Sequence, residues 1–194
     1  MSKRFAWLAV LIVALVAAWS FGVSAAPQYL WSMDSEDEIA DYGDDNTGAA
    51  FELNKVFVAQ GAGSCKVTPG GDAAETKMAL KLEGTSLPLF IGNDSLAMNV
   101  YIPAAMAVKP NTFFMGMADV TGDWKWVDGI FSLTVASAGW NKVVYPLGPA
   151  MMEASENNRY MLYFAFFAKN ADGSKPPLKE AFYLDAIWME RTAK

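Results

Sequence analysis

Short apolar runs with a two-residue period recur along the chain. In residues 76–82, for example, Met78, Leu80 and Leu82 alternate with small or charged residues. This is the period of a β-strand with one buried face. The stretch 96–102 continues this pattern, and apolar runs predict further strands at 29–33, 51–59, 64–68, 112–119, 124–127, 130–135 and 140–147. The run 159–168 is apolar at most positions, which predicts a strongly buried strand.

The last predicted strand, 181–190, is apolar on both faces, which is typical of a central strand in a buried sheet. One face would carry Phe182, Leu184, Ala186 and Trp188, and the other Tyr183, Ile187 and Met189.

A carboxylate, Asp185, stands within this apolar strand, where burial without a partner costs several kcal/mol. Either water reaches it near the beginning of the strand, or it has a partner. The chain has no histidine. The partner would therefore be a lysine, an arginine, backbone N–H groups or a hard cation.

Turn signals such as Gly61-Ala62-Gly63 and Thr121-Gly122-Asp123 separate the runs, and the chain shows no sustained helical period. One helical turn is expected at 151–158, and 104–108 is expected to be a short loop or a helical turn. This pattern predicts an all-β antiparallel sandwich.

The N-terminus has the pattern of a secretory signal peptide. Lys3 and Arg4 precede the apolar run 5–18, and small residues lead to a cleavage site after Ala25. We therefore expect a signal peptide helix at 1–25, one domain at 26–194, and a secreted, periplasmic or cell-surface location. The alternative is an uncleaved anchor, because residues 5–23 could span a bilayer.

Charge and cysteine content limit the partners. Without residues 1–25, 13 cations would face 21 acids, a net charge of about −8. This balance disfavours nucleic acid or an anionic membrane as a partner. Cys65 is the only cysteine, so no intrachain disulfide forms; it is expected to be buried, with an intermolecular bridge as the alternative. A homo-oligomer stays open.

Enzymatic chemistry has little support. The lack of histidine excludes Ser-His-Asp and Cys-His arrangements and imidazole-bound zinc. A pair of carboxylates could in principle hydrolyse glycosides, but nothing in the sequence indicates a carboxylic acid with a raised pKa in a cleft. We expect a protein that is not an enzyme.

An acidic run follows the first predicted strand. It consists of Asp34, Glu36, Asp37, Glu38, Asp41, Asp44 and Asp45. Mutual repulsion favours a solvated loop. The alternative is a cation site using one or two of these oxygens, although the EF-hand spacing is not present.

Several motifs, in this order, resemble the jelly-roll, galactose-binding-like carbohydrate-binding modules. They are the strand 96–102 closed by Pro103, the run Gly139-Trp140-Asn141-Lys142-Val143, and the closing strand Phe182-Tyr183-Leu184-Asp185-Ala186-Ile187. The resemblance covers almost all of 26–194. It implies a structural calcium held by Asp185 and an acidic residue of the first strand, here Asp34. Glu36 is the alternative, because Ser32-Met33-Asp34-Ser35 departs from the family's phenylalanine-glutamate-aspartate-glycine.

The family binds sugars by stacking aromatic rings on them, with polar side chains on the hydroxyls. Trp124 and Trp126, two residues apart, are the candidate platform, flanked by Asp123 and Lys125. The alternative is that one of the two tryptophans caps the core. Three other tryptophans are expected in the core: Trp31, Trp140 and Trp188.

Two functions follow. The first is an exported, non-catalytic, carbohydrate-binding-module-like protein that binds a glycan and holds structural calcium. The alternative is a structural or assembly subunit of the cell envelope that uses the same fold without binding sugar. An exposed Trp124/Trp126 pair favours the first, and an exposed methionine and phenylalanine patch the second. The methionines expected to fill the core are Met115, Met117, Met151, Met152 and Met161.

Overall fold

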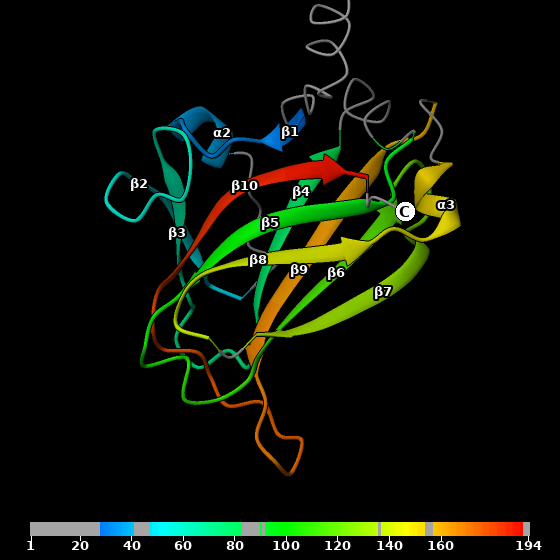
Figure 1. Cartoon of the computed structure of the whole chain (residues 1–194). Helices are drawn as coiled ribbons and strands as arrows, with labels where there is room; N and C mark the ends of the chain where they lie inside the picture. The colour runs from blue at the N-terminus through cyan, green and yellow to red at the C-terminus, as the bar shows by residue number, and fades with distance from the viewer. Residues whose placement is uncertain are drawn as a thin grey trace, which may run out of the picture.

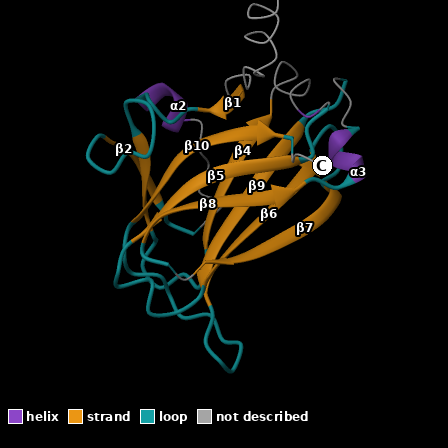
Figure 2. Ribbon diagram, in the orientation of Figure 1, coloured by secondary structure: helices purple, strands orange, loops and turns teal. Residues whose placement is uncertain are grey.

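The protein is an all-β sandwich of two antiparallel sheets, as predicted (Figures 1 and 2). The computed structural model describes residues 28–40, 47–82, 90, 92–135, 137–153 and 157–191. The predicted signal peptide and its helix, residues 1–25, lie outside the described residues. Among the described helices, none is long and apolar enough to cross a membrane.

The six-stranded sheet runs β2-β3-β10-β5-β8, and β1 also pairs with β10. Its strands are β1 (Gln28–Trp31), β2 (Ala50–Asn54), β3 (Ser64–Thr68), β5 (Ser95–Ile102), β8 (Gly139–Pro146) and β10 (Phe182–Glu190). The four-stranded sheet runs β4-β9-β6-β7. Its strands are β4 (Thr76–Leu82), β6 (Asn111–Asp119), β7 (Lys125–Val135) and β9 (Tyr160–Ala168). The described residues also form two short helices, α2 (Glu36–Ala40) and α3 (Pro149–Met152).

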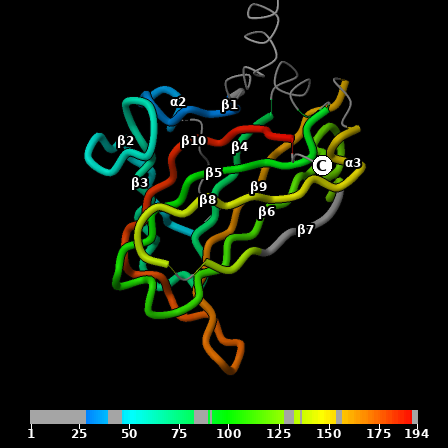
Figure 3. Tube along the Cα trace, in the orientation of Figure 1, coloured from blue at the N-terminus to red at the C-terminus, as the bar shows by residue number. Residues whose placement is uncertain are grey.

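The first and last strands lie side by side, as the blue and red ends of the tube in Figure 3 show. β1 pairs antiparallel with the second half of β10, while β3 pairs with its first half. β5 covers the other edge of β10 along its whole length. The closing strand is therefore central in its sheet, as its two-sided apolar sequence predicts.

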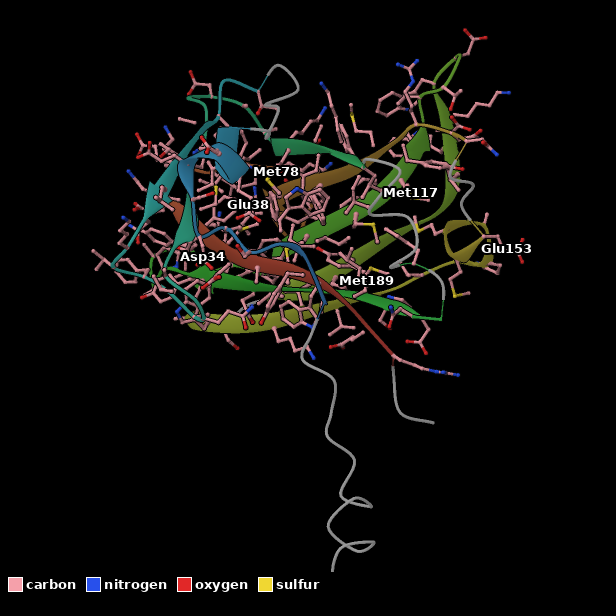
Figure 4. The ribbon with its side chains drawn as sticks, turned by 90° about the horizontal axis from the view of Figure 1, so that it is seen from above. Asp34, Glu38, Met78, Met117, Glu153 and Met189 are labelled. Atoms are coloured by element: carbon pink, nitrogen blue, oxygen red, sulfur yellow. The ribbon has the colours of Figure 1, made fainter. Side chains whose placement is uncertain are left out.

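The core fills the space between the two sheets. Met78, Met117 and Met189, from three different strands, point into it (Figure 4). Met115, Met151 and Cys65 are also fully buried, whereas Met152 and Met161 are half-buried. The buried side chains of β4 alternate with the predicted period of two. β9 also alternates over most of its length, although its sequence predicts a strongly buried strand.

The expected faces of β10 are wrong after Asp185. The register with β5 shifts between Asp185 and Ile187, and Ala186 has a positive φ of 52°. This β-bulge inserts one residue and reverses the alternation. Ile187 and Met189 consequently enter the core together with Phe182 and Leu184, while Trp188 packs with Ala97 and Ala186 in a separate cluster.

The strand predicted at 51–59 ends earlier, at Asn54. The side-chain oxygen of Asn54 accepts the backbone N–H groups of Val56 and Phe57, at 2.9 and 2.8 Å. This local turn competes with further pairing of the strand. Residues 55–63 form a loop instead, and this loop matters for the site below. The strands predicted at 124–127 and 130–135 are in fact one, β7.

The acidic run is not simply a solvated loop, because part of it forms α2. The Glu38 carboxylate turns back and accepts the backbone N–H groups of Ser32 and Asp34, at 2.5 and 3.2 Å. Ile39 is buried in the core. Glu36 is exposed, and Asp41, Asp44 and Asp45 lie outside the described residues.

Candidate functional site

Asp185 is fully buried, although it points away from the core, because the loop 55–63 lies over it. Its Oδ2 accepts the backbone N–H groups of Ala59 at 2.5 Å and Gln60 at 2.9 Å. Of the alternatives left open by the sequence, backbone N–H groups are thus the partners present. The other oxygen, Oδ1, is buried and accepts no hydrogen bond from any described residue.

The electrostatics of Asp185 reflect this incomplete pairing. Burial raises the pKa of its carboxyl above the usual value, the two N–H groups lower it, and the nearby charge of Asp34 raises it again. Loss of hydration penalises the charged form more than the two hydrogen bonds favour it. A cation or a proton at Oδ1 would relieve the cost.

Asp34 holds the other end of the same loop. Asp34 follows the end of β1 in the chain and lies beside the loop. Figure 4 shows it on the same side of the molecule as Glu38. Its Oδ1 accepts the N–H groups of Ala62 at 2.6 Å and Gly63 at 2.9 Å. Gly61 has a positive φ of 71°, and a Cβ there would lie only 2.7 Å from Asp34 Oδ2. The close approach of loop and carboxylate therefore requires a glycine.

Asp34 and Asp185 fit a hard cation only in part. Oδ1 of Asp185 has no partner among the described residues, and the two carboxylates repel each other. However, the described residues contain no group of three carboxylate, cysteine or histidine side chains that could hold a metal ion. A calcium ion at this place would need backbone carbonyl oxygens to complete its six to eight ligands.

The second candidate site lies on the outer face of the four-stranded sheet. Trp124 and Trp126 expose 47% and 44% of their surface, and both pack against Tyr163 of β9. Their ring centroids are 5.5 Å apart and each lies 5.8–6.1 Å from that of Tyr163. We call these three residues the tryptophan surface. Its rings are nearly perpendicular, with interplanar angles of 83–87°.

Small residues form the floor beneath these rings. Trp126 pairs with Ala118 in the ladder of β7 and β6, and its ring lies over Gly116. A Cβ added at Gly116 would lie 2.8 Å from Cζ3 of Trp126, so the ring can rest on the sheet only because a glycine stands there. The position of the Trp126 ring is therefore set by the strand pairing rather than by a loop.

Charged residues are neighbours of the tryptophan surface along the sequence or along the strand ladder. Asp123 and Lys125 are exposed beside the two tryptophans. Across the sheet, Trp126 pairs with Ala118, Ala118 pairs with Met161, and Met161 pairs with Lys81 of β4. Asp119 accepts the N–H group of Thr121 and a hydrogen bond from Asn158, and these bonds hold the pKa of Asp119 below its usual value.

Sequence reasoning missed Tyr163 and Gly116. The prediction of a strongly buried strand at 159–168 does not hold at Tyr163, which has the opposite parity to its buried neighbours Leu162 and Phe164 and faces outward. That alternation was the available signal. The expectation of a core position was right for Trp31, at 8% exposure. Trp140 is instead half-buried on the outside of the six-stranded sheet, beside Tyr101, and Trp188 packs in the separate cluster described above.

Carbohydrate-binding modules are among the solved structures that share this fold. The chain matches one described as a carbohydrate-binding module of the β-sandwich superfamily with a TM-score of 0.58, at 14% identity, covering 86% of this chain and 63% of that one. It matches the xylan-binding domain of module family 22 with a TM-score of 0.54, at 13% identity and 88% and 99% coverage. A family 27 module of Caldicellulosiruptor saccharolyticus, solved with mannohexaose, gives 0.53, at 16% identity and 88% and 100% coverage.

No family model matches the sequence, and no curated protein matches it either. At these identities the structural matches define the fold alone. The predicted resemblance to β-sandwich carbohydrate-binding modules is confirmed at that level.

Proposed function

We propose that this protein is an exported, non-catalytic glycan-binding protein and that the tryptophan surface is its binding site. Trp124 and Trp126 would stack on the apolar faces of sugar rings, while Asp123 and Lys125 would bind hydroxyl groups. The observation that carries the proposal is the exposure of two large aromatic rings side by side on a strand-built floor of small residues. Large exposed apolar side chains in one patch mark binding surfaces.

The geometry of the rings narrows the ligand. Rings that stand perpendicular to one another do not form a flat platform. They suit a single glycan chain, whose successive sugars rotate relative to one another, better than the flat face of a crystalline polysaccharide. The matched structures described as a xylan-binding domain and as a module with mannohexaose point to soluble xylan and mannohexaose as the first probes.

The alternative of an assembly subunit has less support. It would be favoured by an exposed methionine and phenylalanine patch. Of the five methionines named above, Met115, Met117 and Met151 are instead fully buried, and Met152 and Met161 are half-buried.

A structural calcium ion at Asp34 and Asp185 belongs to the same proposal. Its support is the buried Oδ1 of Asp185 and the repulsion between the two carboxylates. Calcium would tie together β10, the end of β1 and the loop 55–63.

Export rests on the leader-like sequence of residues 1–25. Mass spectrometry of the protein secreted by its host would test it: a mature chain that begins at residue 26 is expected, and one that retains residues 1–25 would contradict it. Residues 26–194 would then form the single exported domain.

Affinity electrophoresis in soluble xylan, together with calorimetry with mannohexaose, tests glycan binding. We expect the wild type to bind at least one of these probes, and Trp124→Ala/Trp126→Ala to lose the part of that binding that the tryptophan surface provides. Tyr29→Ala is the matched control, since Tyr29 is a similarly exposed aromatic residue, at 41%, on the other sheet. Unchanged binding by the double variant would remove the tryptophan surface from the proposal.

A further inference from the structure

A second set of aromatic side chains crosses the outer face of the six-stranded sheet. Strand register places Tyr183 of β10 opposite Tyr101 of β5, and Tyr101 opposite Trp140 of β8. Their neighbours along the strands, such as Leu184 and Val100, are in the core. The three rings therefore point outward in one straight row, which we call the tyrosine row, and all three are half-buried.

Phe57 joins this row from the loop 55–63. Its ring centroid lies 4.9 Å from that of Tyr101 and 4.7 Å from that of Tyr183. On the other side of Tyr101, the Trp140 ring is 5.5 Å away at an angle of 70°. Phe57 keeps 37% of its surface exposed. The four rings thus form a corrugated aromatic surface rather than a closed cluster.

The backbone of Phe57 is held on both sides. Its N–H group donates to Asn54 Oδ1 at 2.8 Å, and its carbonyl oxygen accepts the hydroxyl of the buried Ser64 at 2.6 Å. Further along the loop, Asp185 binds Ala59 and Gln60. An exposed ring whose backbone is fixed in advance loses little entropy when it binds a ligand.

Polar groups lie directly beside the rings. The next row of the same sheet face places Asn99 opposite both Asp185 and Lys142. Within the described chain, no residue forms a hydrogen bond with the Asn99 side-chain amide, which is half-buried. Lys142 is exposed and pairs with Glu190 at 2.7 Å. Amide and ammonium donors next to aromatic faces are the chemistry that binds a hydroxyl-rich ring.

We propose that Phe57, Tyr101 and Trp140, with Asn99, form a second glycan-binding surface, so that one chain binds two glycan segments. The class of ligand rests on the proposed function. The two sheets pack through their inner faces, so the tyrosine row and the tryptophan surface face away from each other on opposite sides of the sandwich. A short oligosaccharide cannot contact both, and the protein would cross-link separate glycan chains.

The test compares two double variants, Phe57→Ser/Trp140→Ala and Trp124→Ala/Trp126→Ala, with the quadruple variant. Calorimetry with mannohexaose or a xylan oligosaccharide gives the stoichiometry, and agglutination of xylan-coated beads reports cross-linking. We expect each double variant to reduce the stoichiometry from about two to about one per chain and to stop agglutination. The quadruple variant should not bind. Val56→Ser, at a neighbouring loop residue that is 80% exposed, is the matched control.

Unchanged stoichiometry and agglutination in Phe57→Ser/Trp140→Ala would overturn the inference and leave the proposed function intact. Loss of all binding in that variant, with none lost in Trp124→Ala/Trp126→Ala, would support the second surface and overturn the first. A wild type that binds neither probe would overturn both. If Trp140→Ala lowers the stability of the fold, the single variant Phe57→Ser replaces the double variant, because Phe57 lies in the loop rather than in a strand.

Discussion

Asp34 and Asp185 bind the same loop from its two ends. Asp185 accepts the N–H groups of Ala59 and Gln60, and Asp34 accepts those of Ala62 and Gly63. The two carboxylates are 151 positions apart in the sequence, so the loop joins the beginning of the fold to its closing strand. Because the two carboxylates repel each other, we expect the stability of this junction to respond to cations.

Calcium should stabilise the protein, and Asp185→Asn should abolish this response. A bound cation would give Oδ1 of Asp185 a partner and offset the repulsion with Asp34. Calcium at 100 times its dissociation constant adds about 2.7 kcal/mol to the free energy of unfolding. The Tm should therefore rise by roughly 2–4 °C for each kcal/mol in a protein of this size. Calorimetry in EDTA and in excess calcium measures the shift.

Asparagine is chosen because it keeps an oxygen acceptor for Ala59 and Gln60 while removing the charge. Asp185→Ala serves as the contrast: it leaves both N–H groups without their acceptor, and we expect a loss of about 1–3 kcal/mol even in EDTA. An equal calcium response in wild type and Asp185→Asn would rule out the cation site.

Gly61→Ala should destabilise the protein more than Gly71→Ala. Both glycines have a positive φ, 71° and 52°, which costs other residues about 1–2 kcal/mol. A Cβ at Gly71 meets no described atom within 4 Å, whereas one at Gly61 collides with the Asp34 carboxylate. Urea unfolding of both variants separates the collision from the backbone cost. Equal losses would mean that Asp34 can move aside freely.

Gly116→Ala should weaken glycan binding at the tryptophan surface without unfolding the protein. The new methyl group would displace the Trp126 ring, whose Cζ3 lies 2.8 Å from its position. Since 44% of the Trp126 surface is exposed and its ring lies outside the core, the ring can move outward at little cost to the core. Tryptophan fluorescence and mannohexaose affinity measure the change. Gly122→Ala, where the Cβ has no described neighbour within 4 Å, should leave both unchanged.

Cys65 should make stability depend on pH in alkaline solution. Burial raises the pKa of its thiol from 9.0 to about 12. In the unfolded chain the thiol ionises near pH 9, while in the folded chain it stays protonated. Ionisation therefore lowers the free energy of the unfolded state only, and the free energy of unfolding falls between pH 9 and 12. The slope approaches about 1.4 kcal/mol per pH unit. Cys65→Ala should flatten this part of the urea-unfolding profile. An identical slope in both proteins would show that other groups cause it.

The fold was largely predictable from the sequence because a period of two marks each half-buried strand. β4 follows it closely. The period-two pattern failed at Ala186, because a β-bulge inserts one residue there and the hydrophobic pattern does not reveal it. It failed again after Asn54, where a side chain captured the backbone N–H groups that a longer strand would have paired.

The candidate site was predictable only in its chemistry. A carboxylate in an apolar strand and two tryptophans two residues apart can be recognised in sequence. The partners of those residues come from distant strands: Tyr163 reaches Trp126 through the pairing of β9 with β6 and of β6 with β7. The tyrosine row likewise depends on the register of three strands. Sequence periodicity gives the face of a residue but not its neighbour across the sheet.

The additional residue at Ala186 also determines which mutations this strand can tolerate. Without this residue, every side chain after it in β10 would point to the opposite face of the sheet. The indole of Trp188 would then point into the core, and Ile187 and Met189 would point outward. Deletion of residue 186 should thus destabilise the fold far more than most substitutions there. Related chains should carry other residues at this position rather than lack the residue.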